Sequence, residues 1–316
     1  MELGHTLREA VIYFQSFDNC HKFMVELRWP DGIVRCPRCN SDHVTYLEKA
    51  RVWKCYGKHE SPKFSLKTGT VFEDSPLGLD KWLPAVWLIV NDKNGISSWE
   101  LHRAIGVTQK TAWFMLHRIR LAMQDDGGGK LGGEVEVDES MIGGKSRNMH
   151  KAKRAEKIHG TGGMDKAIVF GMVERDGRVR AMHLDSRRRE ELQSAIRENI
   201  EAGSAIFSDE LPSYNGLTDN YEHAVINHAI EYVNGNVHTN TIENFWSLLK
   251  RGLHGTYISV EPFHLFRYID EQVFRYNNRK GMNDRARFEL AISQIVGKRL
   301  TYKALTGKDG DSTTPF

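Results

Sequence analysis

Three acidic residues in the C-terminal half have the types and positions needed for phosphodiester chemistry. They are Asp138 in GEVEVDES, Asp209 in AIFSDEL and Glu243 in TNTIENFW. The first two end short apolar runs rich in β-branched residues and the third opens an amphipathic run, so all three could meet at one edge of a sheet. Hard cations such as Mg²⁺ and Mn²⁺ take oxygen ligands, and a pair of them can clamp the attacking and leaving oxygens of a phosphodiester. A single carboxylate after a strand is typical of a solvated turn, but the set predicts a divalent-metal site.

A second group of metal-type ligands lies near the N-terminus. All four cysteines fall within the first 55 residues, which in a reducing compartment favours metal binding over disulfides. Two ligand pairs separated by about 15–20 residues are typical of a zinc ribbon, in which one structural Zn²⁺ is held tetrahedrally. The predicted ligands are Cys36, Cys39, Cys55 and His59.

The residues between the ligand pairs favour a ribbon. Strand-forming Val44, Tyr46, Val52 and Trp53 predict a hairpin, and FSLKTGTVF continues the strand pattern. His43 or Cys20 could replace His59 as the fourth ligand. Buried cysteines without a metal are the alternative interpretation.

Composition and charge limit the class of protein. The 316 residues are 40% hydrophobic and 27% charged, which is ordinary for a globular chain of about two domains. The net charge of +3 is only mildly basic, but Lys145 to Lys157 and Arg187 to Arg189 are basic clusters suited to phosphate. Because neither a membrane span nor a signal peptide is evident, we expect a cytoplasmic protein with no membrane partner.

The segment from Leu79 to Met123 has helical periodicity. Gly106 ends one helix and Thr108 is an N-cap candidate for the next, which reads as a helix-turn-helix. Gln109, Lys110 and Thr111 would then open the recognition helix, with Arg118 further along it, and contact double-stranded DNA. The alternative is a plain helical bundle. In both interpretations we expect four residues to be core: Trp87, Trp99, Trp113 and Leu116.

The Gly-rich stretch after Asp125 marks the clearest boundary, because a glycine run neither continues a helix nor packs. Beyond it, periodicity predicts strands, a helix, further strands and a second helix. The predicted strands are 133–138, 166–173, 178–184, 205–208 and 223–226, and the predicted helices are 189–202 and 241–251. This order predicts a mixed α/β, RNase H-like fold with helices on both faces of the sheet and with the first and fourth strands adjacent. Asp138 and Asp209 would then be neighbours.

Several motifs together resemble a family: the ISXO-like insertion-sequence transposases of the DDE superfamily. They are CPRC with the following KC, H and FSLKTGTVFEDSPL, then VDES, SDELPSYNGL and HTNTIENFWSLLKRGLHGTY. The resemblance covers nearly the whole chain. It implies a transposase that uses two Mg²⁺ or Mn²⁺ ions, cuts DNA at element ends and joins the 3′-OH to target DNA. It also implies a homodimer or higher oligomer on paired terminal repeats.

The resemblance also implies site residues. Asp138 and Asp209 match the first two catalytic aspartates. Glu243 is the expected third, with its neighbour Asn244 as the alternative; consecutive helical residues point about 100° apart, so both cannot face the metals equally. Further residues are expected to contact DNA: Lys250, seven positions after Glu243, with Arg251, Lys145, Lys153 and Arg154.

We therefore expect six segments. They are an N-terminal helical segment (1–28), a zinc ribbon (29–75), a helix-turn-helix-like DNA-binding domain (76–125), a Gly-rich linker (126–132), an RNase H-like catalytic domain (133–300) and a C-terminal tail (301–316). Two rival functions use the same features: a DNA-binding regulator, and an RNase H-like nuclease without strand transfer.

Overall fold

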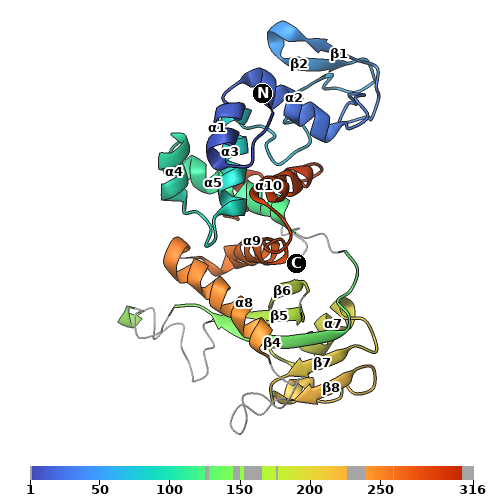
Figure 1. Cartoon of the computed structure of the whole chain (residues 1–316), viewed down its shortest axis with the longest axis vertical. Coiled ribbons are helices and arrows are strands. Elements are labelled where there is room, and N and C mark those ends of the chain that lie inside the picture. The colour runs from blue at the N-terminus through green and yellow to red at the C-terminus, as the bar shows by residue number, and fades with distance from the viewer. Residues whose placement is uncertain are drawn as a thin grey trace. The chain divides into compact units, whose positions relative to one another are not determined.

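The computed structural model describes residues 2–124, 128–144, 150–152, 166–175, 177–225, 239–258 and 260–307 (Figure 1). The chain divides into two compact units, one of residues 1–124 with 280–316 and one of residues 125–279. The expected catalytic domain extended to residue 300, whereas this division places everything from Lys280 onward with the first unit. The reason is aromatic packing, because Phe288 contacts the rings of Phe14 and Trp87.

The first unit is mainly helical. Its helices are α1 (Leu7–Phe14), α2 (Phe17–Arg28), α3 (Leu79–Asn91), α4 (Ser98–Ile105), α5 (Gln109–Met123), α10 (Asp284–Ser293) and α11 (Tyr302–Thr306). None of the helices in the described part of the chain has the length and apolar character that a bilayer crossing requires.

Local sequence signals begin and end the helices of the predicted helix-turn-helix. Ser97 and Glu100 form a capping box at the start of α4. Gly106 ends that helix with φ of +64°, a left-handed conformation that glycine adopts without strain. The Thr108 hydroxyl then accepts from the Thr111 N–H and begins α5. The two helices and their glycine turn thus follow the predicted pattern.

One predicted core residue of this unit is exposed. Trp87 and Leu116 are buried as expected, but Trp99 on α4 is 60% exposed. The periodicity prediction for Trp99 was therefore wrong. The buried positions of this short helix are Leu101 and Ile105, and Trp99 lies outside that apolar stripe.

The ribbon is a small antiparallel sheet of β1 (Val44–Leu47), β2 (Val52–Cys55) and β3 (Lys63–Phe64), with the turn η1 (Glu48–Ala50) between the first two strands. Trp53 on β2 stacks on Phe64 of β3 at 5.7 Å between ring centroids. The predicted hairpin is confirmed, and its register places Val44 opposite Cys55.

The second unit is built on a five-stranded mixed sheet. Its strands are β4 (Glu134–Ile142), β5 (Ala167–Glu174), β6 (Val179–Leu184), β7 (Ala205–Ser208) and β8 (Glu222–Val225), in the order β6-β5-β4-β7-β8. The first three pair antiparallel, whereas β7 runs parallel to β4 and to β8. This is the RNase H-like topology expected from the sequence, with the first and fourth strands adjacent.

Helices cover both faces of this sheet (Figure 1). They are α7 (Arg189–Asn199), α8 (Asn240–Arg251) and α9 (Leu265–Asn277), with short helical turns η3 (Pro212–Tyr214), η4 (Gly252–Tyr257) and η5 (Pro262–His264). Because side chains alternate along a strand, Val135 and Val137 of β4 pack toward α7, and Glu136 and Asp138 point to the other face, where α8 lies.

Candidate functional site: a Cys3His cluster and a carboxylate pair

The four predicted zinc ligands come together in the ribbon. Atoms of Cys36, Cys39, Cys55 and His59 all lie within 4.8 Å of one another. The Cys36 sulfur is 3.5 Å from His59 Nε2, and the Cys39 and Cys55 sulfurs are 3.6 Å apart. A tetrahedral zinc with bonds of about 2.3 Å to sulfur places its ligands about 3.8 Å apart. The donor set therefore fits one structural Zn²⁺.

Backbone geometry around the ligands explains this convergence. The Asn40 N–H donates to the Cys36 carbonyl at 2.9 Å, and Asn40 has φ of +57°, so the chain reverses tightly after Cys39. The Gly57 N–H donates to the Cys55 sulfur at 3.2 Å. A Cβ at Gly57 would lie only 2.9 Å from the Cys39 sulfur, so glycine makes room for the cluster.

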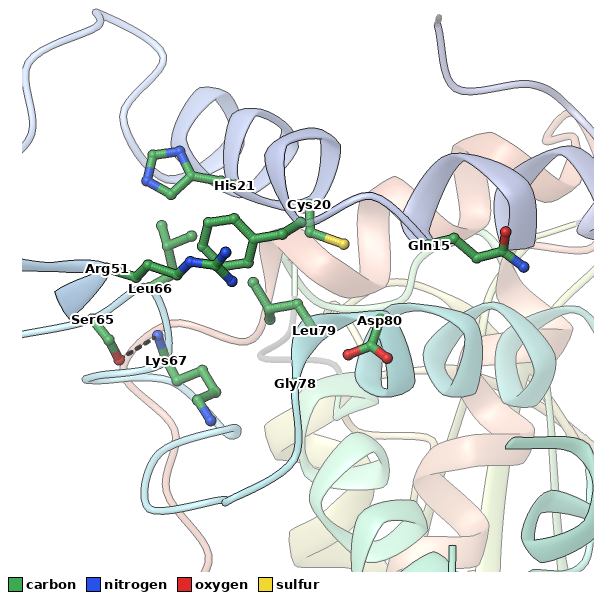
Figure 2. A pocket seen from close by; sticks show the side chains of 11 residues that line it. Gln15, Cys20, His21, Arg51, Ser65, Leu66, Lys67, Gly78, Leu79 and Asp80 are labelled. Carbon is green, nitrogen blue, oxygen red and sulfur yellow. Dashed lines mark hydrogen bonds between the residues drawn. The ribbon is translucent and has the colours of Figure 1, made fainter. Parts of the chain in front are cut away.

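The two alternative fourth ligands lie elsewhere. The thiol of Cys20 donates to the Phe14 carbonyl at 3.1 Å, and burial raises the pKa of that thiol to about 12. Figure 2 shows Cys20 in a pocket beside Leu79 and Asp80. His43 stacks on Tyr56 with ring centroids 4.8 Å apart. His59 is thus the histidine of the cluster.

Of the four residues on α5 that were predicted to contact DNA, three lie at the start of the helix and one is buried. Lys110 is exposed and lies over the ring of Tyr302, and Gln109 donates to the Ser98 hydroxyl at 2.8 Å. Thr111 is half-buried beside the Thr108 cap. Arg118 is only 4% exposed and donates to the Glu73 carbonyl. The expected DNA contact by Arg118 is therefore replaced by a structural role, because its guanidinium is used inside the unit.

The sheet of the second unit brings Asp138 and Asp209 together. Glu136 is level with Phe207 in the parallel pairing of β4 with β7, and the two aspartates lie two residues further along these two segments. Burial raises the pKa of Asp138 to about 7, and the negative charges of Glu139 and Asp209 add to this shift. A further negative charge at Asp138 is therefore unfavourable unless a cation neutralises it.

Asp138 has a specific hydrogen-bond partner on α8. The indole Nε1–H of Trp246 donates to Asp138 Oδ2 at 2.8 Å, and this contact lowers the pKa of Asp138 against the larger effect of burial. Gly171 on β5 is directly opposite Asp138. A Cβ at Gly171 would lie 2.7 Å from the Trp246 ring, so only glycine lets that ring approach the sheet here.

A further carboxylate, Glu139, lies beside the pair. Its side chain is 5% exposed and accepts from the Tyr214 hydroxyl at 2.6 Å. Burial raises the pKa of Glu139, and the nearby charge of Asp209 raises it further. Arg187, from one of the basic clusters, lies 3.8 Å from Glu139. One residue of the basic cluster 187–189 therefore lies next to the group of acidic side chains.

Glu136 fixes the start of α8 on β4. Its fully buried carboxylate accepts from the N–H groups of Thr241 and Ile242 at 2.8 and 3.0 Å and from the Thr241 hydroxyl at 3.0 Å. Arg175 pairs with the same carboxylate at 3.1 Å. A carboxylate at a helix N-terminus satisfies unpaired N–H groups and interacts favourably with the helix dipole.

The remaining predicted residues lie on α8 or outside the described chain. Glu243, Asn244, Lys250 and Arg251 are all exposed on α8. Within the described part of the chain, the Cys3His set is the group of three or more ligands placed to hold an ion, so Glu243 does not close a three-carboxylate set with Asp138 and Asp209. Three expected DNA contacts lie outside the described residues: Lys145, Lys153 and Arg154.

Sequence reasoning missed Glu136, Glu139, Tyr214 and Trp246. The signal for Glu136 was available, because a charged residue between Val135 and Val137 in a strand with helices on both sides must have a buried partner. Trp246 falls three residues after Glu243, and its spacing alone indicated only core packing.

The chain is similar to known families and proteins. Residues 130–277 match the ISXO2-like transposase domain, and residues 16–57 match the transposase zinc-ribbon domain. A relative is the "Uncharacterized protein in transposable element ISH50" of Halobacterium salinarum, 28% identical over 251 residues that cover 76% of this chain and 84% of the relative.

Among the solved structures that match is the simian T-cell lymphotropic virus intasome in complex with PP2A regulatory subunit B56 gamma. The match has 14% identity and a TM-score of 0.29, and it covers 60% of this chain and 65% of that chain. The chain thus carries a transposase zinc-ribbon domain and an ISXO2-like transposase domain, in line with the family that its motifs resemble.

Proposed function

We propose that this chain is a DDE-type DNA strand transferase, which cleaves a phosphodiester at the end of its insertion sequence and joins the freed 3′-OH to target DNA. The observation that carries the proposal is the Asp138–Asp209 pair at adjacent positions of β4 and the end of β7, inside the ISXO2-like transposase domain. The negative charges of the two aspartates repel one another, and a bound cation would relieve that repulsion.

The donor atoms fit hard divalent cations, since carboxylate oxygens are the ligands that Mg²⁺ and Mn²⁺ prefer. Asp138, Asp209 and Glu243 are the proposed ligands of two such ions, and the exposed Glu243 side chain would turn toward the aspartates when the ions bind. When bound, the ions supply Lewis-acid activation of a water or 3′-OH and neutralise charge on the phosphate. The chain itself positions the reacting groups, and no covalent protein intermediate is required.

The geometry of α8 favours Glu243 over Asn244 as the third ligand. At 3.6 residues per turn, Glu243 lies about 60° around the helix from Trp246, whereas Asn244 lies about 160° away. Trp246 is the residue of α8 that contacts Asp138. Glu243 is therefore on the flank of the helix nearer to the aspartates, and Asn244 is on the far flank.

DNA is the proposed partner. The proposed groove contacts are Lys110 and Gln109 at the start of α5, and the proposed phosphate contacts are Lys250 and Arg251, which are exposed on α8. Lys145, Lys153 and Arg154 are retained as proposed phosphate contacts from sequence alone. We propose action as a homodimer or larger oligomer on paired ends.

A strand-transfer assay tests the proposal. Purified chain is incubated with element-end DNA, either uncut or pre-cleaved, and a supercoiled target in Mg²⁺, Mn²⁺ or chelator. Joined product should require the divalent ion and should disappear in Asp138→Ala and Glu243→Gln. Glu210→Gln and Asn244→Ala are the controls, because each changes the exposed neighbour of a proposed ligand. End binding without cleavage or joining would favour a regulator, and cleavage without joining would favour a nuclease.

A further inference from the structure

Trp246 is the feature of the second unit that core packing alone does not explain. It is the last tryptophan in the sequence and is 4% exposed. Its apolar ring packs in the core between the sheet and α8 with Phe245 and Ile242, yet its polar edge is directed at a carboxylate rather than at the backbone. A buried indole N–H requires an acceptor, and here the acceptor is Asp138 Oδ2 at 2.8 Å.

A glycine on the neighbouring strand β5 makes room for this ring. Gly171 is the cross-strand partner of Asp138, and a Cβ there would lie 2.7 Å from Trp246 Cζ2 and Cη2 and 2.9 Å from Ile242 Cδ1. Real Cβ atoms do not approach other atoms this closely, so α8 would have to move away from the sheet if position 171 carried a side chain. Glycine at 171 thus sets the distance between the indole and Asp138.

The position of α8 along β4 is fixed at a second point. Glu136 holds the N–H groups of Thr241 and Ile242, and it lies on the same face of β4 as Asp138. The first turn of α8 and the Trp246 turn are therefore both attached to one strand. With two attachments, the helix can neither slide along the strand nor rotate without losing a buried hydrogen bond.

We propose that Trp246 is a positioning residue for Asp138: its indole N–H occupies Oδ2 and fixes the carboxylate plane, so that Oδ1 is presented to a divalent cation. The inference rests on the proposed function, because it assumes that Asp138 is a metal ligand. Groups that hydrogen-bond to metal ligands orient them, and losing one typically weakens metal affinity about 10- to 100-fold.

The alternative is that Trp246 only fills the core. Substitution by phenylalanine separates the two roles, since the ring can still pack over Gly171 but cannot donate. The matched control is Phe245→Leu, which reduces packing at the residue of α8 that precedes Trp246. Phe245 is fully buried in the same cluster and has no polar atom in its side chain.

The test is a Mn²⁺ titration of the zinc-loaded full-length protein, with free Mn²⁺ followed by electron paramagnetic resonance. Trp246→Phe should raise the Mn²⁺ dissociation constant about 10- to 100-fold. Phe245→Leu should leave it within about twofold while lowering the unfolding midpoint. Gly171→Ala should weaken Mn²⁺ binding in the same direction by displacing the indole, which provides a second variant if Trp246→Phe does not fold.

The same titration separates failure of this inference from failure of the proposed function. If Asp138→Asn does not weaken Mn²⁺ binding, Asp138 is not a metal ligand and the proposed function is wrong at this residue. If Asp138→Asn abolishes binding while Trp246→Phe and Gly171→Ala bind as the unsubstituted protein does, only the role of Trp246 is overturned. Strand transfer by Trp246→Phe should also recover as the Mn²⁺ concentration is raised, which a purely structural defect would not allow.

Discussion

The two candidate metal sites of this protein are assembled in opposite ways. The Cys3His cluster takes all its ligands from residues 36–59, and a tight turn and one hairpin bring them together. Asp138 and Asp209 are 71 positions apart and meet only because β7 pairs with β4. The first site depends on local backbone geometry, whereas the second depends on the topology of a whole sheet.

The two sites also differ in what surrounds the ligands. The thiols of the ribbon are supported by nearby N–H groups such as that of Gly57. Asp138 is supported by a side chain from a distant helix, Trp246, and is surrounded by other carboxylates. A substitution of a zinc ligand should therefore reduce the stability of the ribbon alone. A substitution at the carboxylate pair should instead reduce the rates of DNA cleavage and joining.

The largest expected effect is in the ribbon. Cys39→Ser removes a thiolate, and structural zinc contributes about 10–16 kcal/mol in zinc-finger peptides, more than this three-stranded sheet can replace. We expect zinc content to fall from about one ion per chain to nearly none. Mass spectrometry gives the zinc content, and hydrogen exchange should show loss of protection across residues 36–64. Mn²⁺ binding by the second unit should be retained, and its loss would contradict the independence of the two sites.

The next effect is on chemistry. Asp209→Asn preserves the size of the side chain. The Leu211 N–H donates to Asp209 Oδ1 at 3.1 Å, and the asparagine amide oxygen can still accept this hydrogen bond. The substitution removes the charge needed for a divalent ion, so cleavage and joining should fall by at least about 10³-fold, or about 4 kcal/mol of transition-state stabilisation. Gel assays of both steps measure the loss, with Glu210→Gln as the control. Zinc content should stay unchanged, and full activity of Asp209→Asn would exclude this residue from the site.

This difference in assembly explains which features the sequence could predict. The zinc set followed from the spacing of Cys36, Cys39, Cys55 and His59, because a ribbon fixes the distance between ligand pairs. The adjacency of Asp138 and Asp209 followed from the order of strands and helices, since an RNase H-like sheet places its first and fourth strands side by side.

The supporting contacts could not be read in the same way. Residue spacing does not show that Trp246 meets Asp138 across 108 positions, or that Glu136 caps α8. The burial of Arg118 was not predicted for a related reason. Helical periodicity does not distinguish an exposed arginine from one whose guanidinium is hydrogen-bonded inside the unit. The sequence likewise does not show that Phe288 packs against Trp87, which lies about 200 positions earlier.

A smaller effect concerns the stability of the protein without divalent metal. Burial raises the folded-state pKa of Asp138 to about 7, above its unfolded value. A raised carboxyl pKa means that the folded state binds the proton more tightly than the unfolded state does. Protonated Asp138 therefore contributes to folding stability at low pH, and this contribution is lost as pH rises through about 7. Asp138→Asn should therefore stabilise the metal-free protein by a few kcal/mol at pH 8, and by less at pH 5. Thermal unfolding in chelator at the two pH values measures this, and destabilisation at pH 8 would contradict it.

The smallest expected effect is on zinc content when the two alternative fourth ligands are changed. Cys20→Ser keeps a donor for the Phe14 carbonyl, and His43→Ala removes only a ring stacked on Tyr56. Each should retain about one zinc per chain, because His59 completes the cluster. His59→Ala is the positive control, since it leaves three ligands and should lower zinc affinity sharply. If Cys20→Ser or His43→Ala lost zinc instead, the ligand set would extend beyond the hairpin, and the ribbon site would be less local than its spacing indicates.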